Sequence, residues 1–145
     1  MITAIDSSVL WAILKQEPGH EKWLQALLGA ASDGPLILCP VVFAELAPST
    51  ADAAGLSGFL GQLAISYSPI TEAAAHLAGQ TFKRYRLDGG PRQHLVPDFL
   101  IAAHAKVQAN RLAAIDRGYL RPWFPDLRLL DCGVARAGAR SSGAS

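Results

Sequence analysis

The stretch that decides the fold is MITAIDSS, residues 1–8, followed directly by VLWAIL, residues 9–14. Residues 2–5 form a short apolar run typical of a buried strand, and this run ends at Asp6. Helical character begins directly after the acid. This order of strand, acid and helix predicts that Asp6 lies at the carboxyl end of a buried strand.

The alternation of strand and helix continues along the chain. Short apolar runs predict further strands at residues 36–39, 65–67 and 112–115, with a fifth at 128–130. Periodicity, capping residues and prolines predict helices over residues 19–31, from 40 to near 48, and over 51–63, 71–86 and 97–110. Strands that alternate with helices predict an α/β fold, in which a parallel sheet of four to five strands carries helices on both faces.

The size and composition indicate one tightly folded domain. The chain has 145 residues, of which 50% are hydrophobic and 17% charged. We assign residues 1–134 to the domain and expect residues 135–145, rich in Ala, Gly, Ser and Arg, to form a flexible tail. A formal net charge of +1 gives no global attraction to a polyanion, so any contact with nucleic acid must rest on local patches.

The two cysteines and the apolar segments indicate the cellular compartment in which the protein is expected. The sequence begins without a basic leader, and no apolar run approaches the roughly 18 residues of a membrane span. Cys39 and Cys132 lie far apart without the spacing of metal ligands, which favours two reduced thiols. We therefore expect a cytoplasmic protein without a membrane partner.

Two acids each follow a predicted strand directly. Asp6 follows the strand at residues 2–5, and Asp116 follows the strand at residues 112–115. Because open parallel sheets bind ligands at the carboxyl ends of their strands, both carboxylates are candidate site residues.

Asp98 and Glu45 are further candidates, each with a structural alternative. Asp98 follows a proline at a helix start, where an acid can serve as a cap or stabilise the helix dipole. Glu45 is the only charged residue between Asp33 and Asp52, and a buried carboxylate is costly unless it is paired or bound to a metal. A salt bridge to an arginine, or a solvent-facing position on an amphipathic helix, would also explain Glu45.

A cluster of these carboxylates predicts a divalent cation. Neighbouring carboxylates repel one another and take up protons unless cations neutralise them. Oxygen ligands without histidine or cysteine spacing favour Mg²⁺, with Mn²⁺ as a possible substitute, over zinc.

Four segments carry a resemblance to a known family. They are IDSS at residues 5–8, VFAEL at 42–46, PDFLIAAHA at 97–105, and DRGY at 116–119 with FPDL at 124–127. In this order they resemble the PIN-domain family, in particular its VapC toxins, over about residues 1–131. The resemblance implies a three-layer α/β/α fold and places Ser8 on the family's small hydroxyl position. The residues that match its acidic positions are Asp6, Glu45, Asp98 and Asp116.

The resemblance also implies an activity and partners. It implies a Mg²⁺-dependent endoribonuclease that acts on RNA, forms a homodimer and is held inactive by a VapB-type antitoxin protein. Asp6 and Asp98 are our choice of direct metal ligands, while Glu45 and Asp116 bind through water, complete a second metal site or orient the nucleophile. Ala114 departs from the pattern, since similar sequences often carry threonine or serine there, which predicts a missing polar contact near Asp116.

Other side chains and functions stay open. Arg84, Arg92, Arg117 and Arg121 could follow an RNA backbone, and a solvated surface explains them equally well. His104, inside an apolar helix, is expected to be structural rather than a ligand. A second hypothesis is a catalytically weak PIN-like module that binds RNA or protein. A third, a phosphatase or phosphoacceptor built on Asp6, fits less well because no acid follows two residues on.

Overall fold

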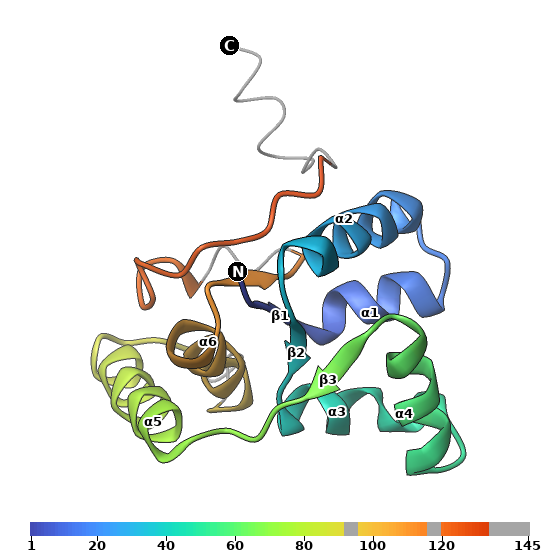
Figure 1. The fold of residues 1–145 in the computed structure, drawn as a ribbon. Helices are drawn as coiled ribbons and strands as arrows, with labels where there is room; N and C mark the ends of the chain where they lie inside the picture. Colours follow the sequence, from blue (N-terminus) through green and yellow to red (C-terminus); the bar gives the residue numbers. More distant parts are fainter. Residues whose placement is uncertain (92–95, 116–119, 134–145) are drawn as a thin grey trace.

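The computed structural model describes residues 1–91, 96–115 and 120–133 (Figure 1). Its strands are β1 (Thr3–Ile5), β2 (Leu36–Leu38), β3 (Ile65–Tyr67) and β4 (Arg111–Ala113). They form one parallel sheet in the order β3-β2-β1-β4. The predicted parallel sheet of an α/β fold is therefore confirmed.

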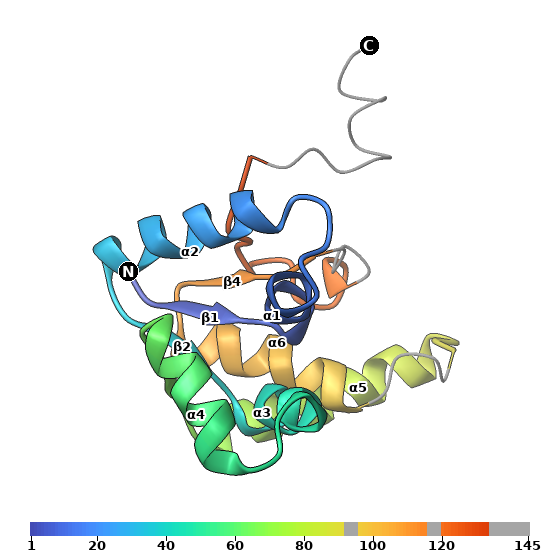
Figure 2. The same ribbon diagram turned by 90° about the vertical axis from the view of Figure 1, so that its right-hand side faces the viewer.

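Helices cover both faces of this sheet. They are α1 (Ser7–Leu14), α2 (His20–Asp33), α3 (Pro40–Leu46), α4 (Ala53–Gln62), α5 (Glu72–Leu87) and α6 (Val96–Gln108), with a short 3₁₀ turn η1 (Ala47–Ser49) after α3. Figure 1 shows α1, α2 and α4 on one side of the sheet and α5 and α6 on the other, and Figure 2 shows the same layers from another side. The three-layer α/β/α architecture is thus confirmed.

The strand order explains why the helices change sides. The chain passes from β1 to β2 to β3 in one direction, and then returns past β1 to form β4 at the opposite edge. Because parallel crossovers are right-handed, a reversal of direction moves the connecting helices to the other face. The reversal lies between β1 and β4, which is the usual place for a ligand site in such a sheet.

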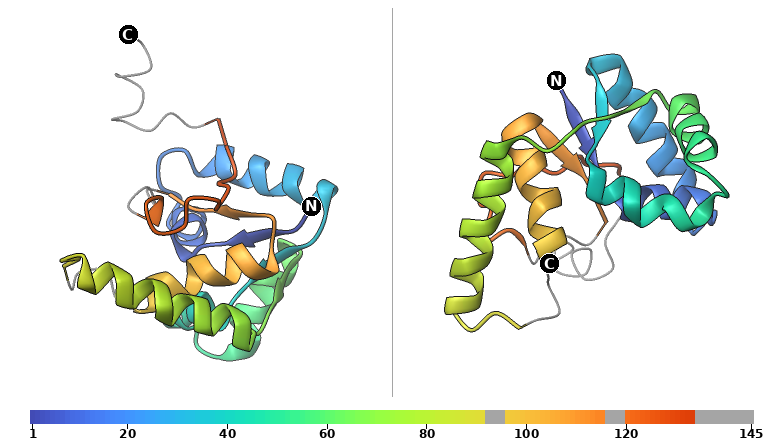
Figure 3. Two further views of the ribbon diagram at one scale, coloured as in Figure 1. Left: turned by 90° about the vertical axis from the view of Figure 1, so that its left-hand side faces the viewer. Right: turned by 90° about the horizontal axis from the view of Figure 1, so that it is seen from below.

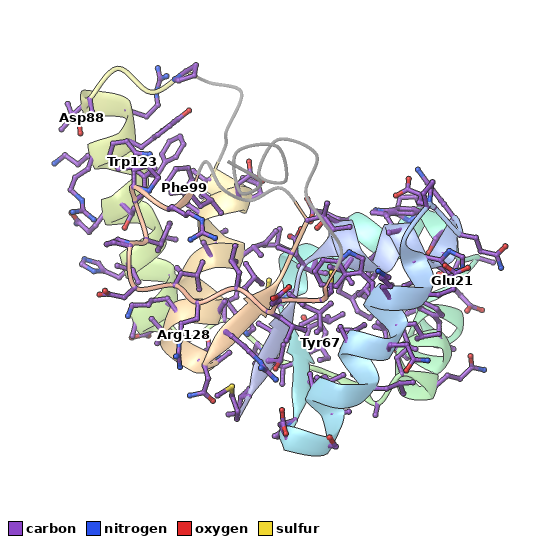
Figure 4. The ribbon with its side chains drawn as sticks, turned by 90° about the horizontal axis from the view of Figure 1, so that it is seen from above. Glu21, Tyr67, Asp88, Phe99, Trp123 and Arg128 are labelled. Carbon is purple, nitrogen blue, oxygen red and sulfur yellow. The ribbon has the colours of Figure 1, made fainter. Side chains whose placement is uncertain are left out.

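The core is built from short, buried strands and the helix faces that pack on them. All three residues of β1 are buried, as parallel strands covered on both faces must be. A second, smaller cluster lies between α5, α6 and residues 120–124, around the fully buried Phe99. Figure 3 shows α5 and α6 side by side, and Figure 4 labels Phe99 and Trp123 at the end of this pair that carries Asp88.

Capping residues set the starts of three helices. Asp6 caps α1, Asp52 caps α4 by accepting from the Gly55 N–H at 2.8 Å, and Thr71 caps α5 by accepting from the Ala74 N–H at 3.2 Å. Each cap satisfies a backbone donor that has no partner within its own helix.

Part of the predicted element pattern differs from the structure. The expected fifth strand at residues 128–130 is reduced to one parallel bridge between Leu112 and Leu129. Helix α6 begins at Val96, one residue before the predicted start at Pro97. The predicted tail, residues 135–145, lies outside the described residues. In the described part of the chain, no helix has the length and apolar character needed to cross a membrane.

Candidate active site

The candidate site begins at Asp6, which lies where the strand order reverses. Ile5 pairs with Ala113 of β4, and the Asp6 N–H donates to the Ala113 carbonyl at 2.9 Å. Asp6 therefore stands at the carboxyl ends of β1 and β4, as the sequence predicted. Its residue exposure is 0%, so this acid is buried in the described structure.

Ser8 holds the Asp6 carboxylate in place. Asp6 Oδ2 accepts from the Ser8 N–H at 3.1 Å, which caps α1, and also from the Ser8 hydroxyl. The same hydroxyl accepts from the Ile115 N–H at 3.0 Å. One side chain thus joins the end of β1 to the segment that leaves β4.

Glu45 lies on α3, and the sequence reasoning about its burial was wrong. Glu45 is exposed, whereas Val42 and Leu46 form the buried face of this short helix. Glu45 has the solvent-facing position on an amphipathic helix that the sequence left open as an alternative. Its carboxylate still has a defined contact, because Oε1 accepts from the Ser7 hydroxyl at 2.9 Å.

Asp98 lies in the first turn of α6 and is half-buried. The other end of α6 leads into Asn110, whose N–H donates to the Ile2 carbonyl at 2.8 Å, beside the start of β1. At about 1.5 Å per residue, Asp98 lies roughly 15 Å from Gln108 along the helix axis. The first turn of α6 is therefore directed toward the carboxyl edge of the sheet, the edge that carries Asp6.

The remaining predicted residues are only partly described. Asp116, Arg92 and Arg117 lie outside the described residues. Arg84, in the last turn of α5, lines a cavity of about 500 Å³ together with Trp123. Arg121 is exposed. Neither arginine extends the set of contacts that joins Asp6, Glu45 and Ile115.

The donor chemistry of the site fits a hard divalent cation. Among residues 1–91, 96–115 and 120–133, no three histidine, cysteine or acidic side chains form a group that could hold a metal ion. Mg²⁺ does not need such a group, since it usually keeps several waters and is held by one or two carboxylates together with substrate phosphates. The carboxylates of Asp6 and Asp98 are oxygen donors of this kind.

Sequence reasoning missed one contact of the site and anticipated another feature correctly. It did not single out Ser7, although the sequence places two serines, Ser7 and Ser8, directly after Asp6. It did predict a structural role for His104, which is buried with its Nε2 3.0 Å from the Ser68 hydroxyl. Burial lowers the pKa of His104 from 6.5.

Comparison with known proteins places this arrangement in a family. The family model for the PIN domain matches residues 3–121. The chain belongs to the PIN-domain family. The predicted family is therefore confirmed.

Individual relatives are VapC proteins. Ribonuclease VapC10 from Mycobacterium tuberculosis is 33% identical over 127 residues, which cover 86% of this chain and 89% of the relative. Among solved structures, VapBC-1 from nontypeable Haemophilus influenzae matches with a TM-score of 0.68 at 18% identity, covering 92% of this chain and 100% of that one. VapC20 from M. tuberculosis, a toxin that cleaves the sarcin-ricin loop, matches with a TM-score of 0.56 at 16% identity. The match covers 87% of this chain and 98% of that one.

Proposed function

We propose that this protein is a Mg²⁺-dependent endoribonuclease and the toxin of a VapBC-type toxin–antitoxin pair. The observation that carries the proposal is the buried carboxylate of Asp6, held by Ser8 at the point where the strand order reverses. The membership of the PIN-domain family and the 33% identity to a ribonuclease support the reaction class.

The described contacts support a site drawn from several chain segments. Asp6 ends β1, Glu45 is held beside the start of α1 by Ser7, and the first turn of α6 brings Asp98 toward the same edge. Ser8 holds the backbone of Ile115, the residue before Asp116. These acids do not form a group of three in the described part of the chain, so the proposal places the ion on one or two carboxylates together with water and the RNA phosphate.

The proposed chemistry is hydrolysis of an RNA phosphodiester bond. A bound Mg²⁺ supplies positive charge that activates water and stabilises the leaving oxygen. Asp6 and Asp98 would hold the ion directly. Glu45 and Asp116 would bind the ion through water, complete a second metal site or orient the attacking water, and Mn²⁺ would substitute for Mg²⁺.

The partners follow from the relatives. The matched structure VapBC-1 carries VapB as well as VapC in its name, which supports a VapB-type antitoxin as the protein partner of this chain. We propose a homodimer for the toxin itself. Arg84, Arg92, Arg117 and Arg121 are the proposed contacts to the RNA backbone.

The test is cleavage of structured RNA by the full-length protein with Mg²⁺ and with a chelator. We expect cleavage only with Mg²⁺, and a loss of at least about 100-fold for Asp6→Asn and Asp98→Asn, because about 3 kcal/mol of charge stabilisation is removed. Metal-independent cleavage that both variants retain would overturn the proposal.

Asp52→Asn is the matched control for Asp6→Asn. Both acids cap a helix, and asparagine caps about as well as aspartate, so both variants keep their caps. Asp52 is exposed at the start of α4 and has no place in the site. We expect Asp52→Asn to cleave like the parent.

A second candidate function is a PIN-like module that binds RNA or protein with weak catalysis. The observation that favours it is Ala114, a buried residue where similar sequences often carry a hydroxyl. Retention of RNA in a gel-shift assay without cleavage under any divalent cation would support this second function.

A further inference from the structure

We infer that Ser7 is a positioning residue for Glu45, and that it fixes this carboxylate relative to Asp6. The inference rests on the proposed nuclease function and deepens it. Ser7 lies in the first turn of α1 and is 6% exposed. Its hydroxyl donates to Glu45 Oε1 at 2.9 Å and joins α1 to α3 across 38 residues.

The start of α1 does not need the Ser7 hydroxyl. Asp6 already caps this helix by accepting from the Ser8 N–H. Within a helix, serine is less favourable than alanine because its hydroxyl competes for backbone hydrogen bonds. A buried serine whose hydroxyl instead reaches a carboxylate on another helix has a role outside its own helix.

Glu45, in contrast, needs an external contact to adopt one position. It lies on the exposed face of α3, a helix of 7 residues. Ordering a glutamate side chain costs rotamer entropy. The hydrogen bond from the Ser7 hydroxyl to the charged carboxylate offsets that cost, because hydrogen bonds to charged groups are stronger than those between neutral groups.

The direction of this contact matters for the site. Ser7 follows Asp6 directly in the chain, so this contact ties the Glu45 carboxylate to the segment that carries Asp6. The next residue, Ser8, holds Asp6 itself and the backbone of Ile115. The two serines therefore set the relative positions of three segments that carry or precede acids of the site.

Residues that orient metal ligands through hydrogen bonds have a measurable effect. Their loss typically costs 10- to 100-fold in metal affinity or activity. We expect Ser7→Ala to lower kcat about 10-fold and to change the KM for RNA less than about twofold, because Glu45 acts on the reacting centre. Ser7→Thr keeps the hydroxyl and is expected to rescue activity.

The experiment combines cleavage kinetics with metal binding in the full-length protein. Mn²⁺ binding, followed by electron paramagnetic resonance, is expected to weaken about 10-fold in Ser7→Ala and to recover in Ser7→Thr. Adding Ser7→Ala to Glu45→Ala is expected to cause no further loss, because Ser7 acts through Glu45. Ser7→Cys, which keeps the size but donates weakly, replaces Ser7→Ala if alanine prevents folding.

Ser68→Ala is the matched control. Ser68 is half-buried, and its hydroxyl also contacts a side chain on a distant element, His104, across 36 residues. That partner is not an acid of the site. We expect Ser68→Ala to stay within about twofold of the parent in kcat and Mn²⁺ binding, since it touches no candidate ligand.

The outcomes separate this inference from the proposed function. Equal kcat and Mn²⁺ binding in Ser7→Ala and Ser68→Ala would overturn the role of Ser7 while the nuclease stands. Losses that multiply in the Ser7→Ala, Glu45→Ala double variant would also overturn it. If the parent cleaves no RNA, the proposed function fails, and the Mn²⁺ measurements alone decide whether Ser7 positions Glu45.

Discussion

The backbone N–H of Ile115 donates to the Ser8 hydroxyl at 3.0 Å, between residues 107 positions apart in the chain. The same hydroxyl donates to the carboxylate of Asp6. Ala114 brings no hydroxyl to this segment, and Ser8 supplies a polar contact there instead. The orientation of Asp6 and the path of the chain toward Asp116 thus depend on one side chain.

Ser8→Ala is expected to lower both stability and activity. The variant leaves the buried Asp6 without one donor and the Ile115 N–H without its acceptor, which costs about 1 to 3 kcal/mol of unfolding free energy. Urea denaturation measures this loss, and RNA cleavage is expected to fall about 10- to 100-fold.

The control for this variant is Ser57→Ala, on the exposed face of α4. Alanine is the better helix former, so this change is expected to be neutral or slightly stabilising. If Ser8→Ala unfolds at the same urea concentration and cleaves at the same rate as Ser57→Ala, Ser8 does not hold the site.

Much of the fold could be predicted from short-range signals. The apolar run that ends at Asp6, the proline at the start of α3 and the threonine that caps α5 each act within a few residues. Such signals are written in the local sequence, and the parallel sheet follows from their alternation. The strand predicted at residues 128–130 is only one bridge in the structure. Its length depends on pairing with β4, and no local sequence pattern encodes that pairing.

The site was predicted less completely, for two physical reasons. Glu45 was taken as buried because apolar residues surround it in the sequence, but the burial of a helix face depends on which elements pack against it. Ser7 was missed because its partner lies 38 residues away. Asp6, in contrast, could be placed because the end of a buried parallel strand fixes its surroundings.

Mg²⁺ is expected to stabilise the folded protein if the candidate site binds it. A ligand that binds only the native state raises the unfolding free energy by about 2.7 kcal/mol at 100 times its dissociation constant. Thermal unfolding with and without Mg²⁺, at equal ionic strength, measures this effect. The stabilisation is expected to disappear in Asp6→Asn and to persist in Asp52→Asn; an equal shift in both variants would place the ion elsewhere.

Replacing Gly90 or Gly79 with alanine is expected to change the unfolding free energy in opposite directions. A Cβ at Gly90 would lie 2.5 Å from the Tyr85 ring and from the Tyr85 carbonyl oxygen, so the loop after α5 must shift, at a cost of about 1 to 3 kcal/mol. Gly79 lies inside α5 with open space around it. Gly79→Ala is expected to raise the unfolding free energy by about 0.5 to 1 kcal/mol. Urea denaturation distinguishes the two, and a Gly90→Ala protein as stable as the parent would contradict the close contact.

The buried His104 is expected to make the stability of the folded protein depend on pH. Burial lowers the pKa of His104 in the folded protein below 6.5, so the unfolded chain binds a proton at higher pH than the folded one does. The unfolding free energy therefore rises with pH between the lowered pKa of the folded protein and 6.5. The stability that the neutral, buried His104 allows is fully present above pH 6.5 and is lost as the pH falls toward the pKa of the folded protein. In His104→Gln, whose amide can keep the contact to Ser68, urea denaturation at several pH values is expected to show a smaller loss on acidification than in the parent. His76→Gln, on the exposed surface of α5, is the control and is expected to lose as much as the parent; an equal loss in His104→Gln would show that His104 does not set this dependence.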